Sequence, residues 1–262
     1  MYWAESTQEF IHTLKPVKPD PALIKRILSV VDLTSLNATD TESSLASFFE
    51  KAQTPFGHVA AVCVYPTFLR LAAAEFAKSP VKVATVVNFP EGEASLESVL
   101  IDIGSALQNG AQEMDVVFPY RRYLAGERKS AQQFVTACKA ACGEVTLKVI
   151  LETGAMKDLE MIADASLDVL MAGADFIKTS TGKINVGASL EAAAIMLLVI
   201  REVSPKLRRQ VGIKISGGVR EIQQAVQYLQ LADNIMGRDW TTPSTFRIGA
   251  SKLVDEMICR VD

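Results

Sequence analysis

The chain has 262 residues, of which 49% are hydrophobic and 22% charged, and its formal net charge is -3 at pH 7. Mild acidity without a basic tail argues against nucleic acid or an anionic membrane as a partner. No apolar run approaches the roughly 20 residues of a membrane helix, and the opening MYWAESTQEF does not resemble a signal peptide. We therefore expect a cytoplasmic protein that binds neither membranes nor nucleic acids.

Short β-branched runs alternate with amphipathic helical stretches along the whole chain. The predicted strands cover residues 28–33, 58–65, 81–89, 113–118, 146–152, 175–180, 211–216 and 233–237. Near-continuous apolar strands separated by helices indicate parallel strands covered on both faces. The pattern predicts an α/β fold, a (β/α)8 TIM barrel, as a single domain over residues 1–262. Residues 1–27 are expected to form an N-terminal helical extension that covers the bottom of the barrel. An open doubly wound sheet is the alternative, but no G-x-G-x-x-G follows the first strand.

Cysteines and histidines predict no metal site. Cys138 and Cys142 lie four residues apart on a predicted helix, but no second Cys or His pair completes a zinc site. The only histidines are His12 and His58, whereas a zinc aldolase or hydrolase would need a cluster of imidazoles. We expect reduced cysteines and chemistry without a metal.

Two lysines lie inside predicted strands at matching positions, Lys178 in DFIKTS and Lys214 in VGIKIS. Burying an ammonium group is costly, and two cations on neighbouring strands lower each other's pKa. A neutral amine of this kind attacks carbonyls and forms a Schiff base. The alternative is that each lysine extends to water at a strand end. The equivalent positions of the two lysines favour the nucleophile.

Two aspartates are candidates for proton transfer beside these lysines. Asp115 lies in the apolar run EMDVVF, and Lys148 on the next strand can pair with it. The pair is either a structural ion pair or part of a general acid–base system. Asp32 ends the first predicted strand with Thr34 beside it. It is either a second such candidate or simply a polar residue at a strand end.

Two turns of small residues predict a phosphate site. Gly217 and Gly218 follow Lys214, and Gly249 and Ser251 lie at the start of the last predicted helix. Open backbone N–H groups and helix N-termini favour anions. The loops after the seventh and eighth strands of a barrel frequently bind a substrate phosphate.

Taken together, these segments resemble the 2-deoxyribose-5-phosphate aldolases, a family of class I aldolases. The resemblance rests on EMDVVFPYR, LKVILETG, GADFIKTSTGK, KISGGVR and RIGAS, and extends from VVDLTSLNATDT to the last helix. It implies reversible cleavage of 2-deoxy-D-ribose 5-phosphate to D-glyceraldehyde 3-phosphate and acetaldehyde, in deoxynucleoside catabolism. It also implies that the enzyme needs no metal or organic cofactor. We further expect a homodimer or another homo-oligomer.

The resemblance also implies roles for individual residues. Lys178 matches the Schiff-base lysine, Lys214 matches the lysine that depresses its pKa, and Asp115 matches the aspartate that shuttles protons with water. The residues that match substrate contacts, to hydroxyls, sugar phosphate or phosphate, are Asp32, Thr34, Lys183, Gly217, Gly218, Gly249 and Ser251.

Three departures from the family pattern and two rival functions remain. Some members carry a tail with a terminal tyrosine proposed to aid proton transfer, whereas this sequence stops at MICRVD, and we expect slower enamine formation if that tail contributes. Ile-Ser-Gly-Gly at 215–218 stands where Pro-Ala-Gly-Gly is usual, which predicts a tuned pocket, and Lys252 replaces the last serine of Gly-Ala-Ser-Ser. One rival is a class I aldolase or transaldolase for another sugar phosphate, because pockets discriminate modestly between similar substrates. The other is a non-catalytic barrel that binds phosphorylated metabolites. Such a protein should have lost one of the three catalytic residues.

Overall fold

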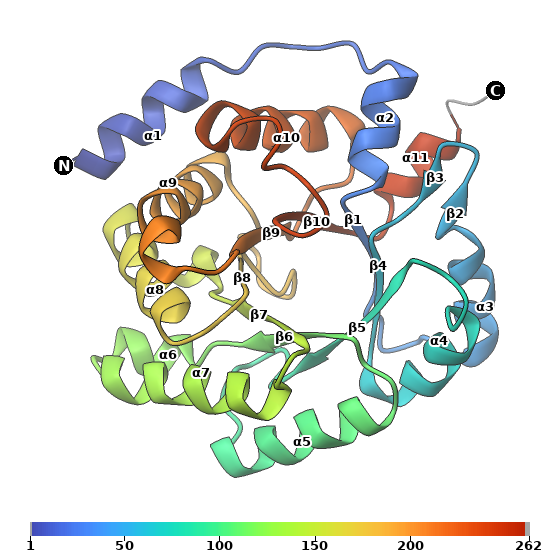
Figure 1. Ribbon diagram of the computed structural model, residues 1–262, viewed down its shortest axis with the longest axis horizontal. Helices are drawn as coiled ribbons and strands as arrows, with labels where there is room; N and C mark the ends of the chain where they lie inside the picture. Colours follow the sequence, from blue (N-terminus) through green and yellow to red (C-terminus); the bar gives the residue numbers. More distant parts are fainter. Residues whose placement is uncertain (1, 260–262) are drawn as a thin grey trace.

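Eight parallel strands form a closed barrel in the computed structural model, which describes residues 2–259 (Figure 1). The order around the barrel is β1-β10-β9-β8-β7-β6-β5-β4. The strands are β1 (Val31–Ser35), β4 (Ala61–Val64), β5 (Lys82–Val87), β6 (Glu113–Val117), β7 (Thr146–Ile150), β8 (Phe176–Lys178), β9 (Gly212–Ser216) and β10 (Phe246–Ala250). The predicted (β/α)8 barrel is confirmed.

Helices surround the barrel (Figure 1). They are α1 (Tyr2–His12), α2 (Pro21–Leu28), α3 (Glu42–Glu50), α4 (Leu69–Glu75), α5 (Leu96–Gln108), α6 (Tyr120–Leu124), α7 (Arg128–Cys142), α8 (Leu159–Met171), α9 (Leu190–Leu207), α10 (Ile222–Met236) and α11 (Leu253–Ile258). Two 3-10 turns, η1 (Pro66–Phe68) and η2 (Thr153–Ala155), and a small antiparallel pair, β2 (Gln53–Thr54) with β3 (Gly57–His58), complete the fold. Within the described residues, no helix combines the length and the apolar character needed to span a membrane.

Local sequence explains where several helices begin. Thr41, Ser95, Asp158 and Ser189 each accept a hydrogen bond from a backbone N–H of the first turn that follows. These caps satisfy donors that a helix start would otherwise leave unpaired. Each cap lies in a loop that starts at the carboxyl end of a strand, so the chain turns back along the barrel at defined points.

The interior of the barrel has an apolar part and a charged part. On β4 and β5, Cys63, Ala84 and Val86 form a small buried cluster separate from the main core. On the other strands the interior holds buried charges, which include Asp115 and Lys148. Side chains on a strand alternate between the two faces. The large aliphatic residues therefore pack against the helices while polar residues enter the barrel.

The prediction of an eighth strand at 233–237 is wrong. Residues 233–236 form the end of α10, and Gly237 follows as its C-cap. The helix extends this far because Val226, Leu229 and Ile235 recur with helical spacing on its buried face. The eighth strand is instead Phe246–Ala250, so Gly249 lies within a strand and not at a helix start. Its sequence, FRIGA, has an arginine and a glycine among three apolar residues, which conceals the strand pattern.

The N-terminal extension divides into two helices with different places. α1 contacts α8, α9 and α10 on the outside of the barrel, not at the bottom (Figure 1). The guanidinium of Arg201 on α9 lies 5.4 Å from the ring centroid of Phe10. α2 contacts α10 and β3 and leads into β1. Arg26 on α2 pairs with Asp233, near the end of α10, at 2.6 Å. Of the two N-terminal helices, α2 and not α1 therefore lies at the end of the barrel where the strands begin.

Candidate active site

A pocket of about 220 Å³ opens where the strands of the barrel end, which is the position of active sites in this fold. All but two of the predicted site residues line it, namely Thr34, Lys178, Lys183, Lys214, Gly217, Gly218, Gly249 and Ser251. The other two, Asp32 and Asp115, are fully buried within the barrel and form ion pairs with lysines that line the pocket. The fold therefore gathers every residue that the sequence singled out.

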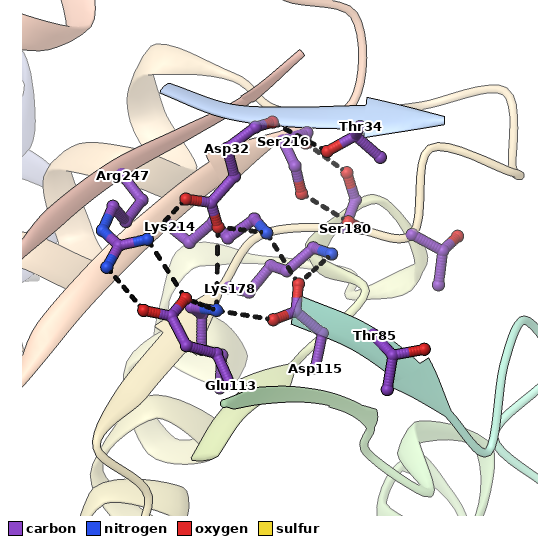
Figure 2. Close-up of polar contacts among 12 residues, drawn as sticks. Asp32, Thr34, Thr85, Glu113, Asp115, Lys178, Ser180, Lys214, Ser216 and Arg247 are labelled. Atoms are coloured by element: carbon purple, nitrogen blue, oxygen red, sulfur yellow. Dashed lines mark hydrogen bonds and ion pairs between the residues drawn. The ribbon is translucent and has the colours of Figure 1, made fainter. Parts of the chain in front are cut away.

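The two lysines lie side by side and share one carboxylate oxygen. Lys178 and Lys214 are direct register partners on β8 and β9. Their Nζ atoms donate to Oδ2 of Asp115 over 2.7 and 2.8 Å (Figure 2). Lys178 is 2% exposed and still lines the pocket. A single carboxylate thus joins both amines at the pocket floor.

Asp115 carries a third ammonium group on its other oxygen. Lys148, its register partner on β7, donates to Oδ1 over 3.0 Å, so the predicted pair is present. Burial by itself raises the pKa of Asp115. The three surrounding ammonium groups of Lys148, Lys178 and Lys214 outweigh burial and hold the pKa well below its ordinary value. Asp115 is therefore a carboxylate at neutral pH.

Asp32 belongs to the same network and not to the pocket wall. Its carboxylate lies 2.6 Å from Lys214 and 2.6 Å from Arg247 (Figure 2). Burial raises the pKa of Asp32, but Lys214, Arg247 and Lys148 lower it further, so the net shift is downward. Asp32 is absent from the pocket lining, and it contacts the pocket through Lys214.

The sequence reasoning missed two residues of this network, Glu113 and Arg247. Arg247 on β10 reaches Oε1 of Glu113 on β6 over 2.7 Å, across the barrel interior. Lys148 lies 2.6 Å from the same carboxylate. A signal existed, because Glu113 precedes Asp115 by two residues and Arg247 precedes Gly249 by two. Residues two apart on a strand point to the same face.

The lysines differ in how the interior affects them. Burial lowers the pKa of Lys214, but Asp115 and Asp32 raise it well above its ordinary value. For Lys148, the attraction of Asp115, Glu113 and Asp32 also exceeds the effect of burial and raises the pKa. For Lys178, burial and the charge of Lys214 together outweigh Asp115, and the pKa falls below its ordinary value. Of the three lysines, Lys178 most readily provides a neutral amine.

Part of the pocket wall is a backbone turn that only glycine fits. Gly217 and Gly218 have φ angles of 95° and 94°, which L-residues rarely adopt. A Cβ on Gly217 would overlap Oγ of Ser180 and lie 3.0 Å from Cα of Gly187. A Cβ on Gly249 would lie 3.1 Å from Cε of Lys214. Gly249 therefore brings open backbone close to Lys214.

Ser216, which departs from the family pattern, ties two loops together. Its hydroxyl donates to the carbonyl oxygen of Ser180, and its backbone N–H donates to Oγ1 of Thr179 over 2.9 Å. Thr179 Oγ1 in turn donates to the carbonyl oxygen of Ser216 over 2.8 Å. An alanine could not make the first of these bonds. The serine therefore adds a link between the ends of β8 and β9.

A buried glutamate holds the turn that carries Lys183. Glu152 accepts hydrogen bonds from the hydroxyl and the backbone N–H of Thr181, over 2.5 and 3.2 Å. Thr181 Oγ1 accepts from the backbone N–H of Lys183 over 3.0 Å. The ammonium of Lys183 donates to the carbonyl oxygen of Leu36 over 2.6 Å. Lys252 is exposed at the start of α11 and does not line the pocket.

A second hollow, of about 360 Å³, lies over the ends of β4 and β5. Its charged lining residues are Glu91, Glu93 and Asp102, and no basic residue lines it. An acidic wall repels a phosphate. Of the two, the lysine pocket is therefore the one whose charge suits an anion.

Comparison with solved structures gives close matches over nearly the whole chain. A candidate deoxyribose-phosphate aldolase of Toxoplasma gondii ME49 has a TM-score of 0.82 and 25% identity, over 90% of this chain and 92% of that chain. A candidate deoxyribose-phosphate aldolase of Coccidioides immitis has a TM-score of 0.78 and 28% identity, over 97% and 96%. The tetrameric deoxyribose phosphate aldolase of Aeropyrum pernix, at 23% identity and a TM-score of 0.71, covers 98% and 97% and supports the fold alone.

A sequence profile for the DeoC/LacD family aldolases matches residues 26–239. This range includes the three pocket lysines, Lys178, Lys183 and Lys214, and the two buried aspartates that Lys178 and Lys214 contact. Because the match covers most of the 262 residues, this chain belongs to the DeoC/LacD family of aldolases.

Proposed function

We propose that this aldolase cleaves 2-deoxy-D-ribose 5-phosphate reversibly to D-glyceraldehyde 3-phosphate and acetaldehyde, through a Schiff base on Lys178. The observation that carries the proposal is the position of Lys178. Lys178 is 2% exposed and lines a pocket that the Gly217–Gly218 turn also lines. An open-chain sugar phosphate has an aldehyde at one end, which can react with the lysine, and a phosphate at the other end, which can bind at the turn. The reaction belongs to the breakdown of deoxynucleosides.

The chemistry begins with the neutral amine. Nζ of Lys178 adds to the C1 aldehyde of the open-chain sugar, and loss of water gives an iminium. The bond between C2 and C3 then breaks, and its electrons flow into the iminium to leave an enamine of acetaldehyde. The proton of the C3 hydroxyl leaves towards Asp115. Protonation of the enamine at C2 and hydrolysis of the new iminium release acetaldehyde and restore the lysine.

Asp115 and Lys214, which are buried next to Lys178, support these proton transfers. Asp115 does not line the pocket, so a water molecule relays the proton between it and the substrate. Lys214 stays an ammonium between Asp32 and Asp115 and keeps Lys178 from holding a proton. Lys183 and the glycine turns bind the anionic end of the sugar, where N–H groups and positive charge favour phosphate. Assembly into a homo-oligomer stays a prediction.

Trapping with borohydride tests this proposal directly. Reduction in the presence of acetaldehyde should leave an ethyl group on Lys178, found by mass mapping of the peptides. A parallel reduction without acetaldehyde serves as the control. Adducts confined to exposed lysines would contradict the proposal. Cleavage of fructose phosphates in preference to 2-deoxyribose 5-phosphate would retain the Schiff base and reassign the substrate.

Replacement of Lys214 by leucine should move the acid limb of the kcat/KM–pH profile to higher pH. The substitution removes a cation that lowers the pKa of Lys178, and it leaves Oδ2 of Asp115 to Lys178 alone. Both changes raise that pKa, so a given fraction of neutral amine needs a higher pH. Profiles of the wild type and of Lys129→Leu, an exposed lysine on α7, give the reference. An unmoved limb contradicts this role of Lys214.

A further inference from the structure

The ion-pair network inside the barrel contains more cations than carboxylates. Among residues 2–259, the basic groups of the network are those of Lys148, Lys178, Lys214 and Arg247, and the acidic groups are those of Asp32, Glu113 and Asp115. All of them except Lys148 are labelled in Figure 2. If every group were ionised, the network would carry one positive charge in excess. An unbalanced buried charge is costly, and a buried amine relieves the cost by losing its proton.

The carboxylates are unequally shared among these cations. Lys148 lies 2.6, 3.0 and 3.7 Å from three different carboxylates. Lys214 has two such partners, at 2.6 and 2.8 Å. Arg247 also has two, at 2.6 and 2.7 Å. Within the described part of the chain, Lys178 has one carboxylate partner, Asp115 at 2.7 Å, and shares that oxygen with Lys214.

The ion pair of Glu113 and Arg247, here called the basal ion pair, underlies this distribution. Arg247 always carries a charge, and it occupies Oδ1 of Asp32 and both oxygens of Glu113. Glu113 in turn holds Lys148 at 2.6 Å. Without Glu113, the nearest carboxylate left to Lys148 would be Asp115 at 3.0 Å, ahead of Asp32 at 3.7 Å, and Asp115 is the carboxylate that Lys178 needs when it is protonated. Without Arg247, the interior would hold three cations and three carboxylates.

We propose that Glu113 and Arg247 are positioning residues that select Lys178 as the nucleophile, by setting the charge balance of the barrel interior. The pair does not line the pocket, so it acts on the reaction through the lysines. The inference rests on the proposed Schiff-base function and adds the reason why this lysine, and neither Lys148 nor Lys214, performs it.

Other groups that face Lys178 do not replace the basal ion pair. From β4, the thiol of Cys63 is fully buried, and burial raises its pKa, so it stays uncharged. After β7, Glu152 is buried, burial raises its pKa, and both of its carboxylate oxygens accept hydrogen bonds from Thr181 and not from Lys178. The remaining charged neighbours of Lys178 are Asp115 and Lys214, and the charges of both are already included in the count for the network.

Opposite shifts in two single variants test the proposal. Glu113→Gln removes a negative charge, so Lys178 should become neutral at lower pH and the acid limb of kcat/KM should move down by about one pH unit. Arg247→Met removes a positive charge, so the limb should move up by a similar amount. The double variant restores the balance, and its limb should return towards that of the wild type.

The direction of the first shift separates charge balance from damage. A loosened interior would hydrate Lys178 and raise its pKa, which moves the limb to higher pH. Glu113→Gln therefore tests the proposal even where Arg247→Met fails to fold. Glu113→Asp keeps the charge and should keep the limb in place. Limbs that stay fixed in both single variants, or that move upward in Glu113→Gln, overturn the proposal.

Trapping on the wild type distinguishes this failure from failure of the proposed function. Borohydride and acetaldehyde should label Lys178 in the wild type and in Glu113→Gln, and in the variant the labelling should persist to lower pH. Labelling of the wild-type lysine with no change in its pH dependence contradicts the basal ion pair alone. A wild type that is never labelled at Lys178 contradicts both the function and this inference.

Discussion

Substitution of Lys178 by methionine is expected to lower aldol cleavage by a factor on the order of 10⁴ or more. No other amine in the pocket can replace it. Lys214 is held as an ammonium by two carboxylates, and Lys183 lies on an exposed turn with its Nζ bonded to a carbonyl oxygen. Loss of the amine therefore removes the covalent route. The measurement is kcat/KM for 2-deoxyribose 5-phosphate together with borohydride trapping.

The same substitution should leave the fold intact. Methionine fills a similar volume and removes a buried amine whose desolvation is unfavourable, while Asp115 keeps Lys148 and Lys214 as partners. We expect a Tm equal to or above that of the wild type. Lys129→Met, at an exposed site on α7, is the matched control. Retention of more than about a tenth of the activity, a barrier change under roughly 1.4 kcal/mol, would contradict a nucleophilic Lys178.

Substitution of Asp115 by asparagine should damage both activity and stability. Activity should fall by about 10² to 10⁴, as expected for loss of a proton-transfer group. The free energy of unfolding should fall by about 3–5 kcal/mol, because Asp115 is the carboxylate that all three interior lysines contact. Asparagine keeps the shape and removes the charge. Denaturant titration and steady-state kinetics measure the two effects.

The stability effect should depend on pH in a defined direction. The pKa of Asp115 is depressed in the folded protein, so its contribution is complete above its unfolded pKa of about 3.9 and is lost as pH falls through the folded value. The difference between wild type and Asp115→Asn should be full at pH 7 and narrow below about pH 4. Asp164→Asn breaks an exposed pair with Arg128 and should cost less than about 1 kcal/mol.

The alternation of apolar strands and amphipathic helices was enough to predict the barrel. Seven of the eight strands lie within the predicted ranges or overlap them, because a parallel strand buried on both faces is apolar throughout. The exception, Phe246–Ala250, has an arginine that enters the interior and pairs with Glu113. Local pattern cannot distinguish a strand with a buried charge from a polar loop.

The candidate site was predictable to a similar extent. Lysines and aspartates inside apolar runs are conspicuous, and Lys178, Lys214 and Asp115 were singled out for that reason. The bond from Ser216 to Ser180 joins the ends of two neighbouring strands, and no local pattern indicates it. Glu113 and Arg247 were missed because their partners are distant in the chain.

The amino-acid sequence by itself determined the fold class, the positions of the buried lysines and aspartates within their strands, and the small-residue turns. These are properties of short segments, set by side-chain period and by glycine's conformational range. Only the tertiary structure decided which carboxylate each cation meets. Closure of the barrel brings β1 beside β10 and joins Asp32 to Arg247, which are 215 residues apart. The charge on a buried lysine depends on all its neighbours at once, so the selection of Lys178 arises in the assembled barrel.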